Sequence, residues 1–380
     1  LDCEIPCSNS NINLNYGNEI ISRLVASNSG LEVTLLQFKE TLKAVDDGLL
    51  LGGHISQLDV DNWLGLVKQW SQPEDPNNSQ KQIHNPWPLP VNAFTLEVDE
   101  MLFLARRFNN VKLEVVRLED AYQIDIDNQS MKGRLLVADD LSNKGVVADF
   151  EYLHWKEATI ADLTQSTQAA EKLPDLHIYS KNFSYLGMPF GELRLEMRNV
   201  IDGMRVETMS LISDSSKIQI SGDWVASQGN EVGLGVSDFA IVMTSEKIAT
   251  FLKQMDFDAP ISNAQTLIQL YASWPGTPSM FDLKDINGTL NLKMGEGEVL
   301  DTKPGFGRVL GLFSLTNLPR RLILDFKDVM AEGLHFDSME GQFVLKKGYA
   351  ETDNFLIKAS AADITVKGLT GFADKSYQQT

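Results

Sequence analysis

Most of this sequence alternates between apolar and polar residues with a period of two. In residues 193–198 three apolar side chains alternate with Arg and Glu, and the same pattern recurs in many later segments. Alternation over four to eight residues, with Gly, Asn or Asp between the runs, is typical of strands with one apolar face. Turn signals such as Asn287-Gly288 lie between the runs and favour hairpins. The sequence therefore predicts a mainly β, mostly antiparallel fold.

The apolar residues of these runs are the candidate residues of one continuous apolar face. They are Leu193, Leu195, Met209, Leu211, Ile218, Ile220, Leu234, Val236, Phe239, Ile241, Leu290, Leu292, Phe343, Leu345, Phe355, Ile357, Ile364 and Val366. A sheet with one apolar face must cover it, either with a second sheet or by curling into a trough. Alternation alone favours the closed sandwich, in which these side chains fill a dry core.

Three short segments have apolar residues at helical spacing instead. Residues 59–70 begin with acidic residues, which the helix dipole favours, and residues 245–255 follow Thr244 or Ser245 as a cap. We expect both helices to pack over an open end or an edge of a sheet.

The third helical segment, near residues 305–317, has an apolar stripe and is followed by two basic residues. The stripe consists of Phe306, Val309, Leu310 and Phe313, and the basic residues are Arg320 and Arg321. One interpretation is that the stripe enters a bilayer interface or closes the end of a trough, with the two arginines as candidates for contacting lipid head groups. The other is that the stripe plugs the sheet and that the arginines are a solvated pair.

Proline punctuates the chain between residues 71 and 90, and more weakly near Trp274-Pro275-Gly276. We therefore predict four parts. Residues 1–70 form an N-terminal β segment ending in an amphipathic helix, residues 71–90 a Pro-rich loop or linker, residues 91–273 repeating β units, and residues 274–380 a C-terminal β region with the helix near 305–317.

The chain also resembles itself. Residues 133–152 align without gaps on residues 222–241, and residues 209–222 match residues 355–368 at a different spacing. Unequal spacings argue against a propeller with blades of fixed length. They indicate a sheet that is extended by repeated hairpin units.

Charge excludes one large class of partner. The chain of 380 residues carries 33 Lys and Arg against 52 Asp and Glu, which gives a net charge of −19. A surface this acidic repels phosphate backbones, so we expect no nucleic-acid binding. Hydrophobic residues make up 43 % of the chain, enough for a large core, but no apolar stretch approaches the roughly 20 residues of a membrane-spanning helix.

We find no constellation typical of catalysis or metal binding, and we expect a protein that is not an enzyme and has no cofactor or metal. The five His are scattered, and the acidic pairs Asp59/Asp61 and Asp125/Asp127 are typical of solvated surface. Cys3 and Cys7 are the only cysteines, so a zinc site lacks ligands. They form a local disulfide in an oxidising compartment or remain two unpaired thiols.

A family resemblance rests on a dense series of motifs after residue 273. The motifs are Trp274-Pro275-Gly276-Thr277-Pro278, Ile286-Asn287-Gly288-Thr289-Leu290, Pro304-Gly305-Phe306-Gly307, Leu318-Pro319-Arg320-Arg321 and Gly333-Leu334-His335-Phe336-Asp337. In order and spacing this region, through Gly371, resembles the C-terminal region of the YhdP type of AsmA-like proteins.

The resemblance implies a fold and a role. The fold is a long, curved, mostly antiparallel β-groove, an open taco-like sheet, so the trough is favoured over the sandwich. The role is that of a periplasmic bridge, anchored in the Gram-negative inner membrane, that conducts phospholipids to the outer membrane and supports its barrier. The chain starts at Leu1 and lacks the family's membrane anchor and usual C-terminus, so we expect a piece of such a bridge. The alternative is a structural module that binds envelope proteins through strand edges and loops.

Overall fold

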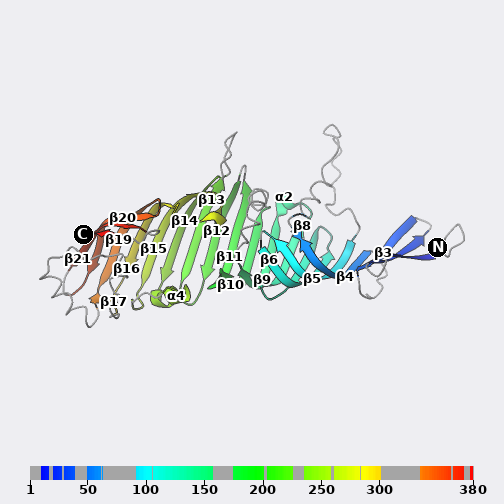
Figure 1. The fold of residues 1–380 in the computed structure, drawn as a ribbon, viewed down its shortest axis with the longest axis horizontal. Helices are drawn as coiled ribbons and strands as arrows, with labels where there is room; N and C mark the ends of the chain where they lie inside the picture. The colour runs from blue at the N-terminus through cyan, green and yellow to red at the C-terminus, as the bar shows by residue number, and fades with distance from the viewer. Residues whose placement is uncertain are drawn as a thin grey trace, which may run out of the picture. The chain divides into compact units, whose positions relative to one another are not determined.

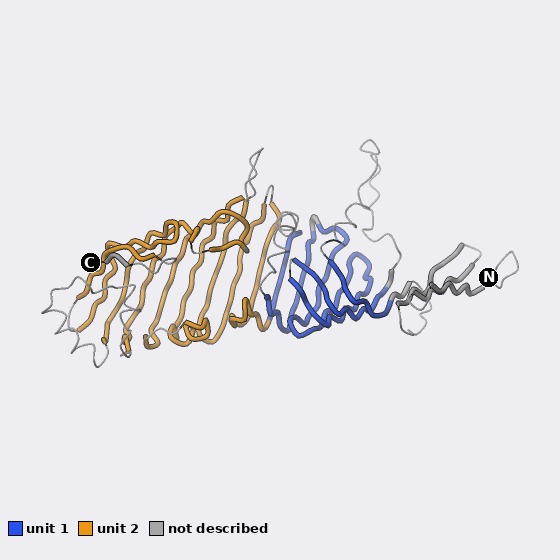
Figure 2. Tube along the Cα trace, viewed as in Figure 1, with its two compact units in different colours: residues 1–169, 174–180 blue, residues 170–173, 181–380 orange. Residues whose placement is uncertain are grey.

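The computed structural model describes residues 10–16, 20–27, 30–38, 49–60, 62, 91–104, 106–156, 174–200, 203–225, 235–257, 261–282, 284–300, 334–360, 363–371 and 377–379. These residues are mostly strands of an open, mostly antiparallel sheet (Figure 1), which confirms the predicted fold class. The chain divides into two compact units (Figure 2): residues 1–169 with 174–180, and residues 170–173 with 181–380. The four sequence-based parts remain a prediction.

Unit 1 is a single run of strands that pair in chain order. They are β1 (Ser10–Tyr16), β2 (Ile20–Ser27), β3 (Gly30–Phe38), β4 (Leu49–Asp59), β5 (Val91–Phe103), β6 (Arg106–Arg117), β7 (Ala121–Asp127), β8 (Met131–Ala138) and β9 (Val146–Trp155), with the one-turn helix α2 (Leu141–Lys144) before β9. All neighbours are antiparallel except that β4 is parallel to both β3 and β5. Because Leu50 lies opposite Ala93 and Leu58 opposite Met101, the strands on the two sides of residues 71–90 belong to one sheet.

Strand β6 shows how the period-two pattern becomes a core. Val111, Leu113 and Val115 are buried, whereas Lys112 and Glu114, which alternate with them on the other face, are exposed. Successive side chains of a strand point to opposite faces, so one face of β6 packs while the other meets water.

Unit 2 continues the same architecture. Its strands are β11 (Met188–Val200), β12 (Gly203–Ile212), β13 (Lys217–Val225), β14 (Val236–Ser245), β15 (Thr266–Pro275), β16 (Asn287–Met294), β19 (Ser338–Lys346), β20 (Tyr349–Lys358), β21 (Asp363–Gly371) and β22 (Tyr377–Gln379). Each pairs antiparallel with the next in this order, and β10 (Leu176–Tyr185) has residues in both units. β17 (Gly297–Val299) and β18 (Leu334–Phe336) form a separate two-stranded sheet.

The sequence repeat corresponds to a repeated strand pair. Gly133 of β8 lies opposite Phe150 of β9, and Gly222 of β13 lies opposite Phe239 of β14. A Cβ atom added at either glycine would lie 2.7 Å from a ring carbon of the facing phenylalanine. Glycine is therefore required at both positions so that the aromatic ring can lie across the neighbouring strand.

The predicted helix at residues 245–255 is present as α4 (Ile248–Gln254), but its predicted cap is wrong. Lys247 occupies the N-cap position and makes no side-chain capping bond. The Ser245 hydroxyl instead accepts a hydrogen bond from the Lys247 N–H at 2.9 Å and donates one to the Ser215 carbonyl at 2.6 Å. Ser245 is therefore the last residue of β14, and its hydroxyl ties the strand end to the preceding hairpin.

The other helical predictions fall mostly on residues that the structure does not describe. At the start of the first, the Asp59 carboxylate accepts a hydrogen bond from the Asn62 N–H at 2.9 Å, as a helix cap does. Most of residues 59–70, the Pro-rich residues 71–90, Cys3, Cys7 and all of residues 305–321 lie outside the described part. Within the described ranges, no helix combines the length and the apolar character that crossing a bilayer requires.

Candidate functional site

One face of unit 2 carries a continuous row of apolar side chains, which we call the central row. Strand pairing places its members side by side across seven neighbouring strands, from β11 to β19. They are Leu195, Met209, Ile220, Ile241, Leu270, Leu290 and Phe343. All seven are partly exposed, and none is polar. A solvent-accessible strip of apolar side chains thus runs across the strands, perpendicular to their direction.

Two flanking rows lie on the same face, one on each side of the central row. The α4-side row consists of Leu193, Leu211, Ile218, Met243, Ile268, Leu292 and Gly341. The η2-side row consists of Met197, Val206, Gly222, Phe239, Ala272, Gly288 and Leu345. On β11–β14 every side chain of both rows is buried, so the open strip there is one row wide.

Short helical segments lie at the two ends of the strands. At one end, α4 follows β14 directly, its Ile248 is buried, and Ser215 donates a hydrogen bond to Gln254 at 2.6 Å. At the other end, the turn after β15 leads into the short helix η2 (Pro278–Met280). We call the strip along the central row, between the strand ends that lead to α4 and to η2, the furrow.

The turn beside η2 is fixed on the apolar face by three contacts. The Trp274 indole N–H donates to the Thr277 carbonyl at 3.1 Å, and the Ser237 hydroxyl donates to the Gly276 carbonyl at 2.8 Å. The ring of Phe281 meets that of Trp274 edge-on, with centroids 5.2 Å apart. This border of the furrow is therefore built from aromatic packing and satisfied polar groups.

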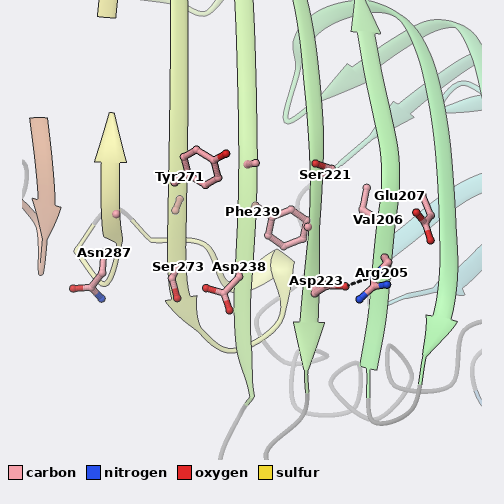
Figure 3. Close-up of a pocket in the computed structure, with 14 residues that line it drawn as sticks. Arg205, Val206, Glu207, Ser221, Asp223, Asp238, Phe239, Tyr271, Ser273 and Asn287 are labelled. Carbon is pink, nitrogen blue, oxygen red and sulfur yellow. Dashed lines mark hydrogen bonds and ion pairs between the residues drawn. The ribbon is translucent and has the colours of Figure 1, made fainter. Parts of the chain in front are cut away.

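The opposite face of the same strands carries the charges. Arg205 and Asp223 form an ion pair at 2.6 Å (Figure 3). The hydrogen bond that the Arg205 guanidinium donates to the Asp223 carboxylate raises the pKa of Arg205. Around it lies a hollow of about 550 Å³ that also includes Asp238 and Tyr271, the latter 63 % exposed. A second hollow of about 530 Å³ includes Glu246 and Lys293 on the same face. Among the described residues, no group of three or more His, Cys, Asp or Glu side chains could bind a metal ion.

The structure brings most of the predicted apolar residues together on one face, but it separates Val236 from them. Val236 is 46 % exposed on the polar face, opposite Val225 and Pro275. Strand β14 pairs with β13 and β15 without a bulge, so Val236 and Phe239, three residues apart, point to opposite faces. The prediction failed because Val236 is the first residue of β14 and directly follows Gly235, whose φ is positive, so the alternation read through Val236 does not carry over into β14.

The predicted apolar residues differ in their exposure to solvent. On β20–β21, Phe355, Ile357 and Val366 are buried and Ile364 is partly exposed. The rings of Phe343 and Phe355 approach to 5.6 Å. Leu234, Phe306, Val309, Leu310, Phe313, Arg320 and Arg321 lie outside the described residues.

Two residues of the open strip are absent from the sequence prediction. Leu270 completes the central row between Ile241 and Leu290, and Ile268 lies beside it. They were missed because Leu267 and Tyr271, on the polar face of β15, are also apolar or aromatic. The sequence of β15 therefore shows no regular alternation of apolar and polar residues. Pairing β15 with the clear alternation of β14 and β16 would have found them.

An open sheet with an exposed apolar row on one face and charges on the other defines a protein of the β-groove class. The chain belongs to the YhdP protein family, whose family model matches residues 2–380. It is similar to the intermembrane phospholipid transporter YhdP of Escherichia coli (strain K12), with 25 % identity over 238 residues. The match covers 60 % of this chain and 18 % of the relative's length. No solved structure matches this chain.

Proposed function

We propose that this chain is a segment of a periplasmic bridge, anchored elsewhere in the inner membrane, that conducts phospholipids towards the outer membrane. The observation that carries the proposal is the central row: seven apolar side chains on seven adjacent strands, all partly exposed. Membership of the YhdP family and the name of the E. coli relative support the lipid as the ligand.

The physical reason is the transfer free energy of the lipid tail. Each CH₂ group gains about 0.8 kcal/mol when it leaves water for an apolar surface. A tail that lies along the central row keeps this gain from strand to strand, because the next side chain is always apolar. The head group stays towards water, since no polar side chain lies in the row. This role requires no bond-making chemistry.

The test compares a charge on the two faces of one strand. Ile241 and Ala240 are neighbours in β14, both partly exposed, with Ile241 in the central row and Ala240 in the polar hollow. We expect Ile241→Asp to reduce phospholipid retained by the purified chain, measured by native mass spectrometry, and Ala240→Asp to leave it unchanged. Equal retention in the two folded variants would contradict the proposal. Leu211 and Ile357 are unsuitable for this test because both are buried and a charge there would disturb the core.

A second candidate function is the docking of an envelope protein on the polar face. The observation that favours it is Tyr271, an exposed aromatic residue that lines a hollow together with Arg205, Asp223 and Asp238. In this case Tyr271→Ser should abolish co-purification of a protein partner while phospholipid retention stays the same.

A further inference from the structure

The α4-side row changes its exposure along the sheet. On β11–β14 its side chains Leu193, Leu211, Ile218 and Met243 are between 3 and 7 % exposed. On β15 and β16 the same row continues with Ile268 and Leu292, which are both partly exposed. The open strip is therefore one row wide on β11–β14 and two rows wide on β15–β16.

The spacing between rows indicates how many lipid tails fit side by side on the face. Neighbouring rows on one face are two residues apart along the strand, which is about 6.8 Å. Apolar atoms in contact lie about 4 Å apart, so one open row offers a floor for one tail, and two tails side by side need two open rows. The η2-side row offers no second floor on β11–β14, because Met197, Val206 and Phe239 are buried.

The length of the narrow part also matches one tail. Strands are about 4.8 Å apart, so the three intervals from β11 to β14 span about 14 Å. A bilayer core of about 30 Å contains two opposed tails, so one tail in a leaflet spans about 15 Å. A tail laid across the strands therefore fills the narrow part from end to end.

We infer that the furrow accommodates one lipid tail in width over β11–β14 and two tails side by side over β15–β16. The inference rests on the proposed function and adds that a two-tailed lipid has its resting position on β15–β16. In the narrow part only one of its tails at a time lies on the floor. Ile268 and Leu292 are thus the residues that distinguish two-tailed from one-tailed lipids.

Photo-leucine provides a test with almost no change in side-chain shape. The chain is produced with photo-leucine, mixed with phosphatidylglycerol in micelles and irradiated, and the adducts are mapped by mass spectrometry. We expect lipid adducts at Leu195, Leu270, Leu290 and Leu292. At Leu193 and Leu211 we expect no adducts above background. Leu292, Leu193 and Leu211 belong to the same row and serve as matched positions.

The outcomes separate the two claims. Adducts at Leu193 and Leu211 equal to those at Leu292 would overturn the one-tail width while leaving the proposed function intact. An absence of adducts at Leu195, Leu270 and Leu290 would overturn the proposed function itself.

A substitution that fills the second row tests the inference independently. Ile268→Trp should reduce retention of phosphatidylglycerol more than that of one-tailed lysophosphatidylglycerol. The matched control is Leu267→Trp on the polar face of β15, which should change neither. An equal loss of both lipids in the Ile268 variant would contradict the two-tail position.

Discussion

Strands β5–β9 of unit 1 and β11–β19 of unit 2 share one sequence pattern but differ in how their apolar faces are covered. On the apolar face of unit 1, one row of paired residues joins Phe94, Val115, Ile124, Leu135 and Ala148. Val115 and Ala148 are each only 3 % exposed, so the row is interrupted, whereas the central row of unit 2 stays open on every strand. Alternation therefore determines which residues share a face, and the packing around that face determines whether a ligand can reach it.

The largest expected effect comes from the dry core of unit 1. Phe108 is completely buried, with its ring 6.1 Å from that of Trp155. Phe108→Ala should lower the free energy of unfolding by about 3–5 kcal/mol because it leaves a cavity. Denaturant unfolding followed by tryptophan fluorescence measures this, and a loss below about 1 kcal/mol would mean that the unit 1 face is as open as the unit 2 face.

Replacing a glycine of the sequence repeat should lower the free energy of unfolding by an intermediate amount. A Cβ at Gly222 would lie 2.2 Å from the Asp238 carbonyl oxygen as well as against the Phe239 ring. Gly222→Ala should therefore cost about 1–3 kcal/mol of unfolding free energy through overpacking. Gly295→Ala is the control, since its nearest contact would be an ordinary 3.7 Å, and similar losses at the two sites would remove the argument for a required glycine.

Truncating a side chain of the central row should lower the free energy of unfolding only slightly but should reduce phospholipid binding. Leu290 is partly exposed, so Leu290→Ala should cost only about 1 kcal/mol of unfolding free energy, less than the removal of a fully buried side chain. Phospholipid retention should nevertheless fall, because the floor loses a contact. A loss as large as that of Phe108→Ala would show that the central row belongs to a closed core.

The smallest effect concerns an ion pair on the surface of unit 1. The hydrogen bond from Lys144 lowers the pKa of Asp120 below its ordinary value. A lowered pKa contributes stability above the ordinary pKa of the carboxyl group, and this contribution is lost as the pH falls through the lowered value. Lys144→Ala should bring the Asp120 pKa back towards its ordinary value in an NMR titration, and an unchanged titration would show that the pair does not form in solution.

The fold was readable from the sequence where alternation is regular. Leu193, Ile218 and Leu290 fall on the predicted face because each lies within an uninterrupted run. The prediction failed at Val236, which directly follows Gly235 with its positive φ. It missed Leu270 because Leu267 and Tyr271, on the opposite face of the strand, are also apolar or aromatic.

The openness of the furrow could not be predicted in the same way. Ile218 and Ile220 are the same residue type, two positions apart on one strand, yet the first is buried and the second is partly exposed. The difference depends on which side chains and segments from elsewhere in the chain pack over each position. Such long-range packing leaves no periodic signal in the strand itself.

The central claim is that the central row is a floor for hydrocarbon, and an experimental structure determined with phospholipid tests it most directly. The account predicts elongated hydrocarbon density that runs across the strands over Leu195, Ile241 and Leu290. A structure in which protein side chains fill that strip, with lipid absent or bound only on the polar face, would contradict it.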